Sequence, residues 1–217
     1  MNDLILWGAT GQAIVLAEFV DRLGYHIVAL FDNDRTATSP LAGVPIYHGA
    51  EGFATWRALR RGGAQALVAI GGEHGDARLA IADQLAREGI PLAIAVHPAA
   101  YVARDAELAA GVQVLAGAVV GARARVGRCV IVNTRASVDH ECILEEGAHV
   151  GPGATLAGLV RVGARSFVGS GAVVLPRLRI GAGAIVGAGA VVTRDVPDAA
   201  VVAGVPAQIT RYRKDEG

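Results

Sequence analysis

Residues 136–158 read ASVDHECILEEGAHVGPGATLAG, and an aliphatic residue occupies every sixth position of this stretch. These positions are Val138, Leu144, Val150 and Leu156. The same series runs without a gap from Val102 to Val192. A helix would require a period near 3.6 and a simple strand a period of 2. A period of six is instead typical of a β-helix built from hexapeptide repeats.

In such a fold three short strands form the three walls of a prism, so one coil takes eighteen residues. Residues eighteen apart then lie in one column, separated by the spacing of hydrogen-bonded strands, about 4.8 Å. Small residues fit this geometry, since alanine often stands two places before the aliphatic position and glycine one place after it. We therefore expect an all-β parallel β-helix over residues 98–217, with a short C-terminal tail.

Residues 1–97 follow a different pattern. Apolar stretches predict strands at 3–7, 26–34, 66–72 and 91–96, and apolar residues at helical spacing predict helices at 13–24, 52–61 and 76–89. Alternating strands and helices of these lengths indicate a small parallel sheet in an α/β domain, about half of a Rossmann-like fold. The boundary between the two domains is predicted near His97.

Composition restricts the class of protein. The 217 residues carry 20 Lys plus Arg and 20 Asp plus Glu, and this balance argues against a nucleic-acid or membrane-surface partner. Mean hydropathy is +0.42, yet no uncharged apolar run reaches the ~20 residues of a membrane-spanning helix. Two cysteines, Cys129 and Cys142, lie among Ala and Val, and the first residues show no signal-peptide pattern. We expect a reduced, cytoplasmic protein.

A glycine turn, Gly8-Ala9-Thr10-Gly11, follows the first predicted strand. Such a turn directs backbone N–H groups and a helix N-terminus at an anion, most often a phosphate. The third glycine of the dinucleotide fingerprint is replaced by Ile14, so a mononucleotide fits better than NAD. The alternative is that the glycines only make a tight turn.

Polar and small residues follow the next two strands. Asp32 and Asn33 end the second strand, where they could meet a ribose hydroxyl or a base. A role for Asp32 as a plain turn or capping residue explains it equally well. Gly71 and Gly72 end the third strand and would let a ligand approach the backbone closely.

The eighteen-residue spacing places His140 in one column with Gly158. Glycine there leaves space above the imidazole and an unshielded backbone N–H, which a general base and an oxyanion donor need. Glu141 follows directly, but Arg123 and Arg177 share its column, so a surface ion pair is an alternative for Glu141. A structural, solvated histidine is the alternative for His140.

Two further polar residues interrupt the repeat in the same coil. His149 stands in a largely apolar column, so it requires a hydrogen-bond partner or serves a ligand. Asn133 stands in a column with three glycines. We interpret the coil that holds Asn133, His140 and His149 as the catalytic one. The histidines at predicted element ends are interpreted as structural: His26, His48, His74 and His97.

The chain resembles the sialic acid O-acetyltransferase-like family through two stretches, NTRASVDHECILEEGAHVGPGATLAGLVRVG at 133–163 and VVAGVPA at 201–207, together with its two-domain pattern. It is most similar to bacterial N-acetyltransferases that act on nucleotide-linked amino sugars. The resemblance implies a left-handed β-helix and transfer of acetyl from acetyl-CoA to the amine of a 4-amino-4,6-dideoxy sugar. It also implies a homotrimer with sites between subunits.

The same resemblance implies roles for the β-helix residues. His140 matches the general base, Glu141 the partner that raises its basicity, and Asn133 belongs to the same motif. His149 matches an acetyl-CoA contact and Gly158 the backbone donor to the thioester oxygen. The positions that line the pantetheine groove are matched by Ser170 and Ala188.

For the nucleotide sugar, the resemblance implies contacts from residues 10–12 and 32–33, namely Thr10, Gly11, Gln12, Asp32 and Asn33. Related sequences commonly carry a histidine where this chain has Gln12. Glutamine can donate a hydrogen bond to phosphate or to a sugar hydroxyl, but it carries no charge.

Other functions fit parts of the sequence. A sugar O-acetyltransferase of the sialic acid type would use the same base and donor, and a non-catalytic nucleotide-sugar-binding protein would use the same first domain. A metalloenzyme of the γ-carbonic-anhydrase kind needs three histidine ligands, whereas only His140 and His149 lie within the repeats. No metal is therefore expected, and direct attack of the amine on the thioester needs no covalent enzyme intermediate.

Overall fold

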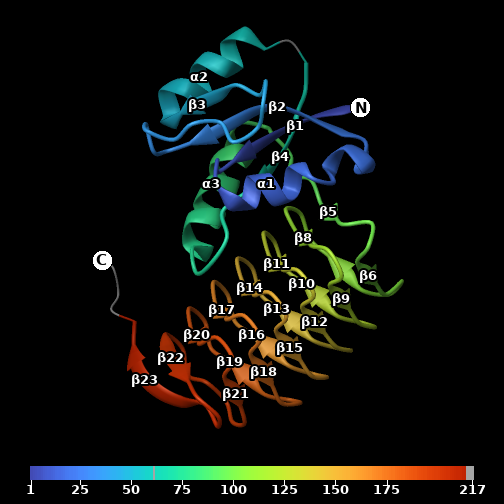
Figure 1. The fold of residues 1–217 in the computed structure, drawn as a ribbon, viewed down its shortest axis with the longest axis vertical. Helices are drawn as coiled ribbons and strands as arrows, with labels where there is room; N and C mark the ends of the chain where they lie inside the picture. Colours follow the sequence, from blue (N-terminus) through green and yellow to red (C-terminus); the bar gives the residue numbers. More distant parts are fainter. Residues whose placement is uncertain (61, 214–217) are drawn as a thin grey trace.

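The computed structural model describes residues 1–60 and 62–213 and contains an α/β domain followed by a parallel β-helix (Figure 1). The first domain holds, in order, β1 (Asn2–Trp7), α1 (Gly11–Ala17), the 3-10 helix η1 (Val20–Leu23), β2 (Tyr25–Asp32), β3 (Ile46–His48), α2 (Gly49–Leu59), β4 (Gln65–Val68) and α3 (Gly75–Arg87). Its sheet is parallel throughout, in the order β3-β2-β1-β4.

Strand β1 is buried on both faces, which explains its continuous apolar sequence. Leu4 and Leu6 pack in one cluster with Leu16 of α1. The intervening side chains of β1 point to the opposite face, where Trp7 stacks on Phe31 with ring centroids 5.3 Å apart. The domain is therefore the small parallel sheet of an α/β fold that the sequence predicts.

Two details of the predicted first domain are wrong. The helix predicted at 13–24 is divided into α1 and η1, because Phe19 leaves the helical conformation (φ −137°) and is fully buried against His97, with ring centroids 4.8 Å apart. The strand predicted at 91–96 does not extend along the first sheet, which it meets in a single parallel bridge between Leu92 and Ala66 of β4. Only β5 (Ala95–Val96) forms there, and it pairs with the β-helix.

The fourth strand of the sheet is instead β3, which is three residues long and half-buried. A segment this short carries no readable alternation of apolar residues, so the sequence gives no strand signal. Arg61, the last residue of the helix predicted at 52–61, and residues 214–217 of the predicted tail lie outside the described residues.

The β-helix has three walls of stacked strands, which are two residues long except for the last two of wall 1. Wall 1 consists of β5, β8 (Gln113–Val114), β11 (Ile131–Val132), β14 (His149–Val150), β17 (Phe167–Val168), β20 (Ile185–Val186), β22 (Ala200–Ala203) and the antiparallel β23 (Gln208–Tyr212). Wall 2 consists of β6 (Tyr101–Val102), β9 (Val119–Val120), β12 (Ser137–Val138), β15 (Thr155–Leu156), β18 (Val173–Val174) and β21 (Val191–Val192). Wall 3 consists of β7 (Glu107–Leu108), β10 (Arg125–Val126), β13 (Ile143–Leu144), β16 (Arg161–Val162) and β19 (Arg179–Ile180).

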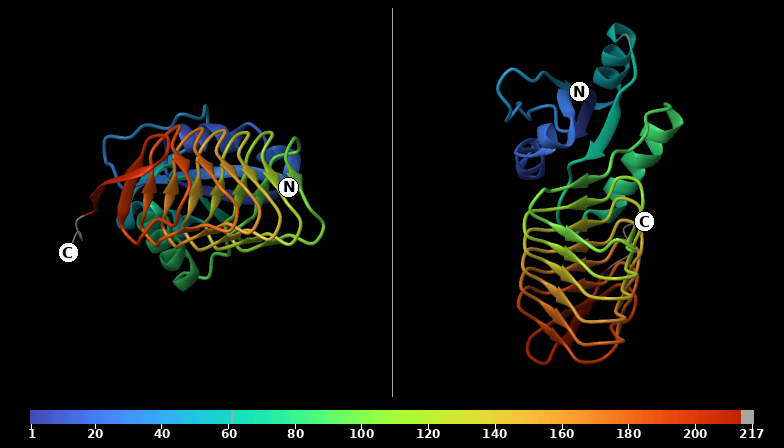
Figure 2. Two further views of the ribbon diagram at one scale, coloured as in Figure 1. Left: turned by 90° about the horizontal axis from the view of Figure 1, so that it is seen from below. Right: turned by 90° about the vertical axis from the view of Figure 1, so that its right-hand side faces the viewer.

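Residues eighteen apart pair across neighbouring coils, as the repeat predicts. His149, for example, pairs with Ile131 on one side and Phe167 on the other. The aliphatic position of each repeat points inward, and from Val114 onward these side chains are buried in a single core. Figure 2 shows the resulting stack of coils, with the α/β domain at its N-terminal end.

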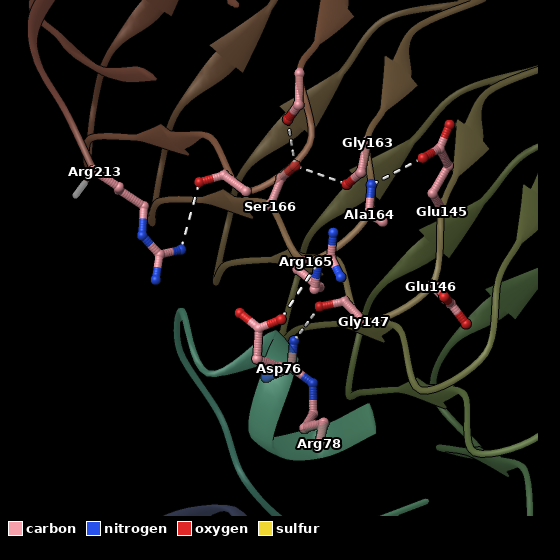
Figure 3. A network of polar contacts seen from close by, with 12 residues as sticks. Asp76, Arg78, Glu145, Glu146, Gly147, Gly163, Ala164, Arg165, Ser166 and Arg213 are labelled. Atoms are coloured by element: carbon pink, nitrogen blue, oxygen red, sulfur yellow. Dashed lines mark hydrogen bonds and ion pairs between the residues drawn. The ribbon is translucent and has the colours of Figure 1, made fainter. Parts of the chain in front are cut away.

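Helix α3 attaches the first domain to the β-helix, and its polar contacts there include those of Arg78 with Gly147 and of Asp76 with Arg165 (Figure 3). The Arg78 guanidinium is buried and donates to the carbonyl oxygens of Cys129 (3.3 Å) and Gly147 (2.5 Å) of the β-helix. It also donates to those of Ile70 (3.1 Å) and Gly72 (3.3 Å), in the loop after β4. Burial lowers the pKa of Arg78 to about 10, so it is still a cation at neutral pH. Arg78 therefore connects this loop to the β-helix through hydrogen bonds.

Within residues 1–60 and 62–213, no helix has both the length and the apolar character needed to cross a membrane.

Candidate functional site

A cavity of about 560 Å³ opens at the carboxyl ends of β1, β2 and β4. This is the edge of a parallel sheet at which ligands usually bind. All seven residues predicted to hold the nucleotide sugar line it: Thr10, Gly11, Gln12, Asp32, Asn33, Gly71 and Gly72. Their assignment as ligand contacts remains a prediction that this cavity supports.

The glycine turn at the cavity depends on its first glycine. Gly8 has φ +113°, and a Cβ at that position would lie 2.3 Å from the carbonyl oxygen of Ala69. Only glycine fits. Asp32 closes the turn, since its carboxylate accepts hydrogen bonds from the N–H groups of Ala9 (2.9 Å) and Asp34 (2.9 Å). Asp32 is thus a turn residue that also lines the cavity.

Gly8 of the predicted glycine turn also lines the cavity, together with four residues for which the sequence predicts no ligand contact: Trp7, Ile70, His74 and Ile81. His74 was interpreted as structural, yet it lies two residues after Gly72, in the loop that leads into α3. This position could have identified His74 as a lining residue, because the loops that follow the strands of a parallel sheet form the ligand site. Trp7 could be read only as a core residue of the first strand.

His149 lies on wall 1, where it contacts the first domain. It is 3% exposed, and its Nδ1 lies 3.1 Å from the carbonyl oxygen of Gly72. A carbonyl only accepts, so Nδ1 carries the proton and the neutral ring has its lone pair on Nε2. That atom accepts from Nδ2 of Asn133 at 2.9 Å. Both ring nitrogens are therefore used within the chain, and none is left for a metal.

Burial, and secondarily the positive charge of Arg78, lower the pKa of His149 from 6.5 to about 4, although the Gly72 contact opposes this. The unfolded chain takes up a proton here near pH 6.5, whereas the folded protein keeps the ring neutral until about pH 4. The stability that this group contributes is therefore complete above pH 6.5 and is lost as the pH falls toward 4.

We expect His149→Gln to be less sensitive to acid than the wild type. Between pH 7.5 and 5, His149 should cost the wild type about 2 kcal/mol of unfolding free energy that the variant does not lose. Urea unfolding of both proteins at the two pH values, at one protein concentration, measures the difference. Other titrating groups contribute to both proteins and cancel. Equal losses in the two proteins would contradict the assignment.

Asn133 contacts His149 and not His140. Its Nδ2 donates to the His149 ring, and its Oδ1 accepts from the N–H of Thr134 at 2.7 Å. Asn133 lies on the edge between walls 1 and 2, whereas His140 lies on the edge between walls 2 and 3. Among the contacts of the described residues, none joins Asn133 to His140. A catalytic role for Asn133 would therefore act through His149.

His140 lies directly against Gly158, as the eighteen-residue column predicts. A Cβ on Gly158 would be 2.3 Å from Nε2 of the imidazole, so the ring occupies the space that any larger residue would fill. Gly158 is buried, and its N–H donates to no acceptor among the described residues. A half-exposed imidazole and an unused backbone donor thus meet at one point.

Glu141 is placed to interact with the same ring. One carboxylate oxygen, Oε1, lies 3.4 Å from Nδ1 of His140 and 3.8 Å from Nη2 of Arg123. The surface ion pair considered from the sequence is therefore present, but the histidine is the nearer partner. A proton on Nδ1 faces the carboxylate, which leaves the lone pair on Nε2, the atom beside Gly158.

Ser170 and Ala188 lie one coil apart in a column at the edge between walls 1 and 2. Both are exposed, and the N–H of Gly189 donates to the Ser170 carbonyl at 2.9 Å. They share this edge with Asn133, and His149 lies on the adjoining wall 1. The assignment of the two residues to an acetyl-CoA groove stays a prediction.

The predicted site residues therefore form two groups in one chain. The first group comprises the cavity and the residues on wall 1 or at its edge with wall 2, namely Asn133, His149, Ser170 and Ala188. The second comprises His140, Glu141 and Gly158, on the edge opposite wall 1. The body of the β-helix separates the groups.

Metal ligands are not gathered in the part of the chain that the structure describes: no group of three or more His, Cys, Asp or Glu is arranged to hold an ion.

Residues 160–194 match the family described as "Bacterial transferase hexapeptide (six repeats)". Over the whole chain, the structure is similar to GDP-perosamine N-acetyltransferase from Caulobacter crescentus, with 36% identity, 97% of this chain and 98% of that chain covered, and a TM-score of 0.89. That enzyme was solved with CoA and GDP-perosamine, including variants in which one histidine is replaced.

A second similar structure is the acetyltransferase domain of PglB from Neisseria gonorrhoeae FA1090, solved with acetyl coenzyme A. It is 34% identical, covers 96% of this chain and 100% of that chain, and has a TM-score of 0.85. WeeI from Acinetobacter baumannii AYE has the same TM-score at 22% identity, which indicates a shared fold.

Proposed function

Because the chain belongs to the bacterial nucleotide-sugar N-acetyltransferases built on a left-handed β-helix, we propose that it acetylates the amine of a nucleotide-linked 4-amino-4,6-dideoxy sugar. The enzyme is an acetyltransferase that uses acetyl-CoA as co-substrate. The observation that carries the proposed chemistry is the His140 imidazole lying against Gly158, whose N–H has no partner among the described residues.

In the proposed reaction the neutral amine attacks the thioester carbonyl carbon of acetyl-CoA. Nε2 of His140 takes the proton that the amine loses, while Glu141 stabilises the resulting imidazolium through Nδ1. The N–H of Gly158 donates to the carbonyl oxygen as it becomes an oxyanion. The C–S bond then breaks, the amide forms, and the CoA thiolate leaves and takes up a proton.

The separation of the two residue groups supports a site shared between subunits of a homotrimer. The cavity lies against wall 1, and His140 lies on the opposite edge, so one chain cannot bring a sugar in its own cavity to its own base. A neighbouring chain can supply that base. The outer face of wall 2 suits such packing, because its outward residues carry no charge: Tyr101, Val119, Ser137, Thr155, Val173 and Val191. Wall 3 carries Glu107, Arg125, Arg161 and Arg179 instead.

The orientation of the substrate follows from the cavity. Asp32 and Asn33 at the end of β2 lie on its far side from the β-helix, and Gly71 and Gly72 after β4 lie on its near side, since Gly72 contacts His149. The acetyl donor is bound by the β-helix. We therefore place the nucleotide toward β2 and the amino sugar toward β4.

The test is a thiol-release assay with acetyl-CoA and a panel of sugar nucleotides. The panel pairs GDP- and UDP-linked 4-amino-4,6-dideoxy sugars with the same nucleotides carrying a 4-hydroxyl, and includes free and CMP-linked sialic acid. We expect release of CoA with one amino sugar and none with its hydroxyl counterpart. Turnover only with a sialic acid would indicate an O-acetyltransferase. Nucleotide-sugar binding without any turnover would indicate a binding protein.

A further inference from the structure

Two glutamine side chains connect the cavity to the β-helix. Nε2 of Gln12 donates to Oε1 of Gln113 at 2.6 Å, across 101 residues of sequence. Nε2 of Gln113 in turn donates to the carbonyl oxygen of Val68, at the end of β4, at 2.8 Å. Gln113 is 1% exposed, on wall 1, whereas Gln12 is half-buried and lines the cavity.

This chain of hydrogen bonds determines which way both amides face. The Val68 carbonyl can only accept, so the atom of Gln113 that contacts it is the NH₂ group. The other atom of that amide is then the carbonyl oxygen, which can only accept from Gln12. Gln12 therefore directs its NH₂ group to Gln113, where one of the two N–H bonds is used, and its own carbonyl oxygen, Oε1, is left for another partner.

That oxygen is open to the cavity. It accepts no hydrogen bond from a described residue, and it is not among the buried polar atoms that lack a partner, which are Trp7 Nε1, Arg60 Nε and Gln65 Oε1. It lies 3.7 Å from the point where a Cβ on Gly71 would stand. The same point is 3.9 Å from Cε1 of His149. Gln12 Oε1 thus faces the part of the cavity nearest the β-helix.

A group that only accepts hydrogen bonds selects for a donor. Phosphate oxygens at neutral pH are acceptors, so they gain nothing from Gln12 Oε1, whereas hydroxyl and amino groups can donate to it. We propose that Gln12, oriented by Gln113, recognises an O–H or N–H group of the sugar and thereby contributes to the choice of sugar. This proposal rests on the proposed function, which places the sugar at this end of the cavity.

The test compares two ligands by titration calorimetry. One is the nucleotide amino sugar that the wild type acetylates, and the other is the nucleoside diphosphate without the sugar. For Gln12→Met, which keeps the length of the side chain and removes its oxygen, we expect Kd for the nucleotide sugar to rise about 5- to 20-fold. Kd for the nucleoside diphosphate should change less than about 2-fold, which also shows that the cavity is intact.

Gln113→Met serves as the matched variant, because it removes the orienting partner without touching the ligand. It should selectively weaken binding of the nucleotide sugar, by a smaller factor than Gln12→Met does, and leave KM for acetyl-CoA unchanged. An equal loss of affinity for both ligands in Gln12→Met, or no loss of affinity for either, would overturn the proposal for Gln12. If the wild type binds neither GDP- nor UDP-linked amino sugars, the proposed function itself is contradicted. If Gln12→Met selectively loses affinity for the nucleotide sugar and keeps normal turnover at saturating substrate, the result supports both the role of Gln12 and the proposed function.

Discussion

The His140→Ala variant is expected to lose about 10²- to 10⁴-fold in kcat for acetyl transfer, the usual contribution of a general base. Among the described residues, the three atoms nearest to a Cβ on Gly158 all belong to this imidazole, whose Nε2 carries a lone pair suited to take a proton from the amine. Its side chain is about half exposed, so its removal leaves no buried cavity and should change Tm little. Steady-state kinetics of acetyl-CoA consumption at saturating acceptor measures the effect.

The matched control is His26→Ala, which removes an exposed histidine at the start of β2, the end of the sheet away from the cavity. It should keep full turnover. Sedimentation and thermal melting of both variants show whether assembly and folding are intact. Near-wild-type kcat/KM in His140→Ala would show that another group is the base.

The Gly158→Ala variant is expected to lose about 10²-fold in kcat, because displacing a catalytic group by about an ångström has an effect of this size. The added Cβ would lie within 2.3 Å of Nε2 of His140, so one of the two must move. The imidazole is half exposed and can turn toward solvent, whereas Gly158 is fixed in the backbone of a coil. The N–H is retained in this variant, so the effect isolates the position of the ring.

Two comparisons make this measurement specific. Gly183→Ala adds a Cβ in open space, at a position whose column neighbour, Arg165, already adopts the same left-handed conformation. It should leave turnover unchanged. In a His140→Ala background, Gly158→Ala should cause no further loss of kcat, since the ring it displaces is absent. Additive losses in the double variant would mean that Gly158 acts independently of His140.

The repeat predicted the β-helix and the neighbours of the candidate site residues on it, because the period of six alone determines which residues share a column. The contact of His140 with Gly158 and the pairing of His149 with Ile131 and Phe167 follow from that arithmetic. The glycine turn and the ends of the next strands likewise predicted seven residues of the cavity, since ligand loops of a parallel sheet gather at one edge.

The contacts between the domains could not be predicted in this way. A period gives neighbours within the β-helix, but it does not say on which wall the first domain packs. Gln12 and Gln113 therefore look unrelated in the sequence, and Arg78 looks like an ordinary helical arginine. The contact of Asn133 with His149 lies within the β-helix, but it joins positions 16 apart, so the eighteen-residue columns do not predict it.

The attachment of α3 has a consequence for how the length of such a protein can vary. Arg78 binds the carbonyl oxygen of Gly147, which belongs to the same coil as His140 and His149. Coils added or removed after this one would lengthen or shorten the prism without moving the cavity relative to that coil. A whole coil inserted before it would slide the catalytic edge by one step of the stack, away from the sugar. Insertions of eighteen residues are thus tolerable on one side of the site and disruptive on the other.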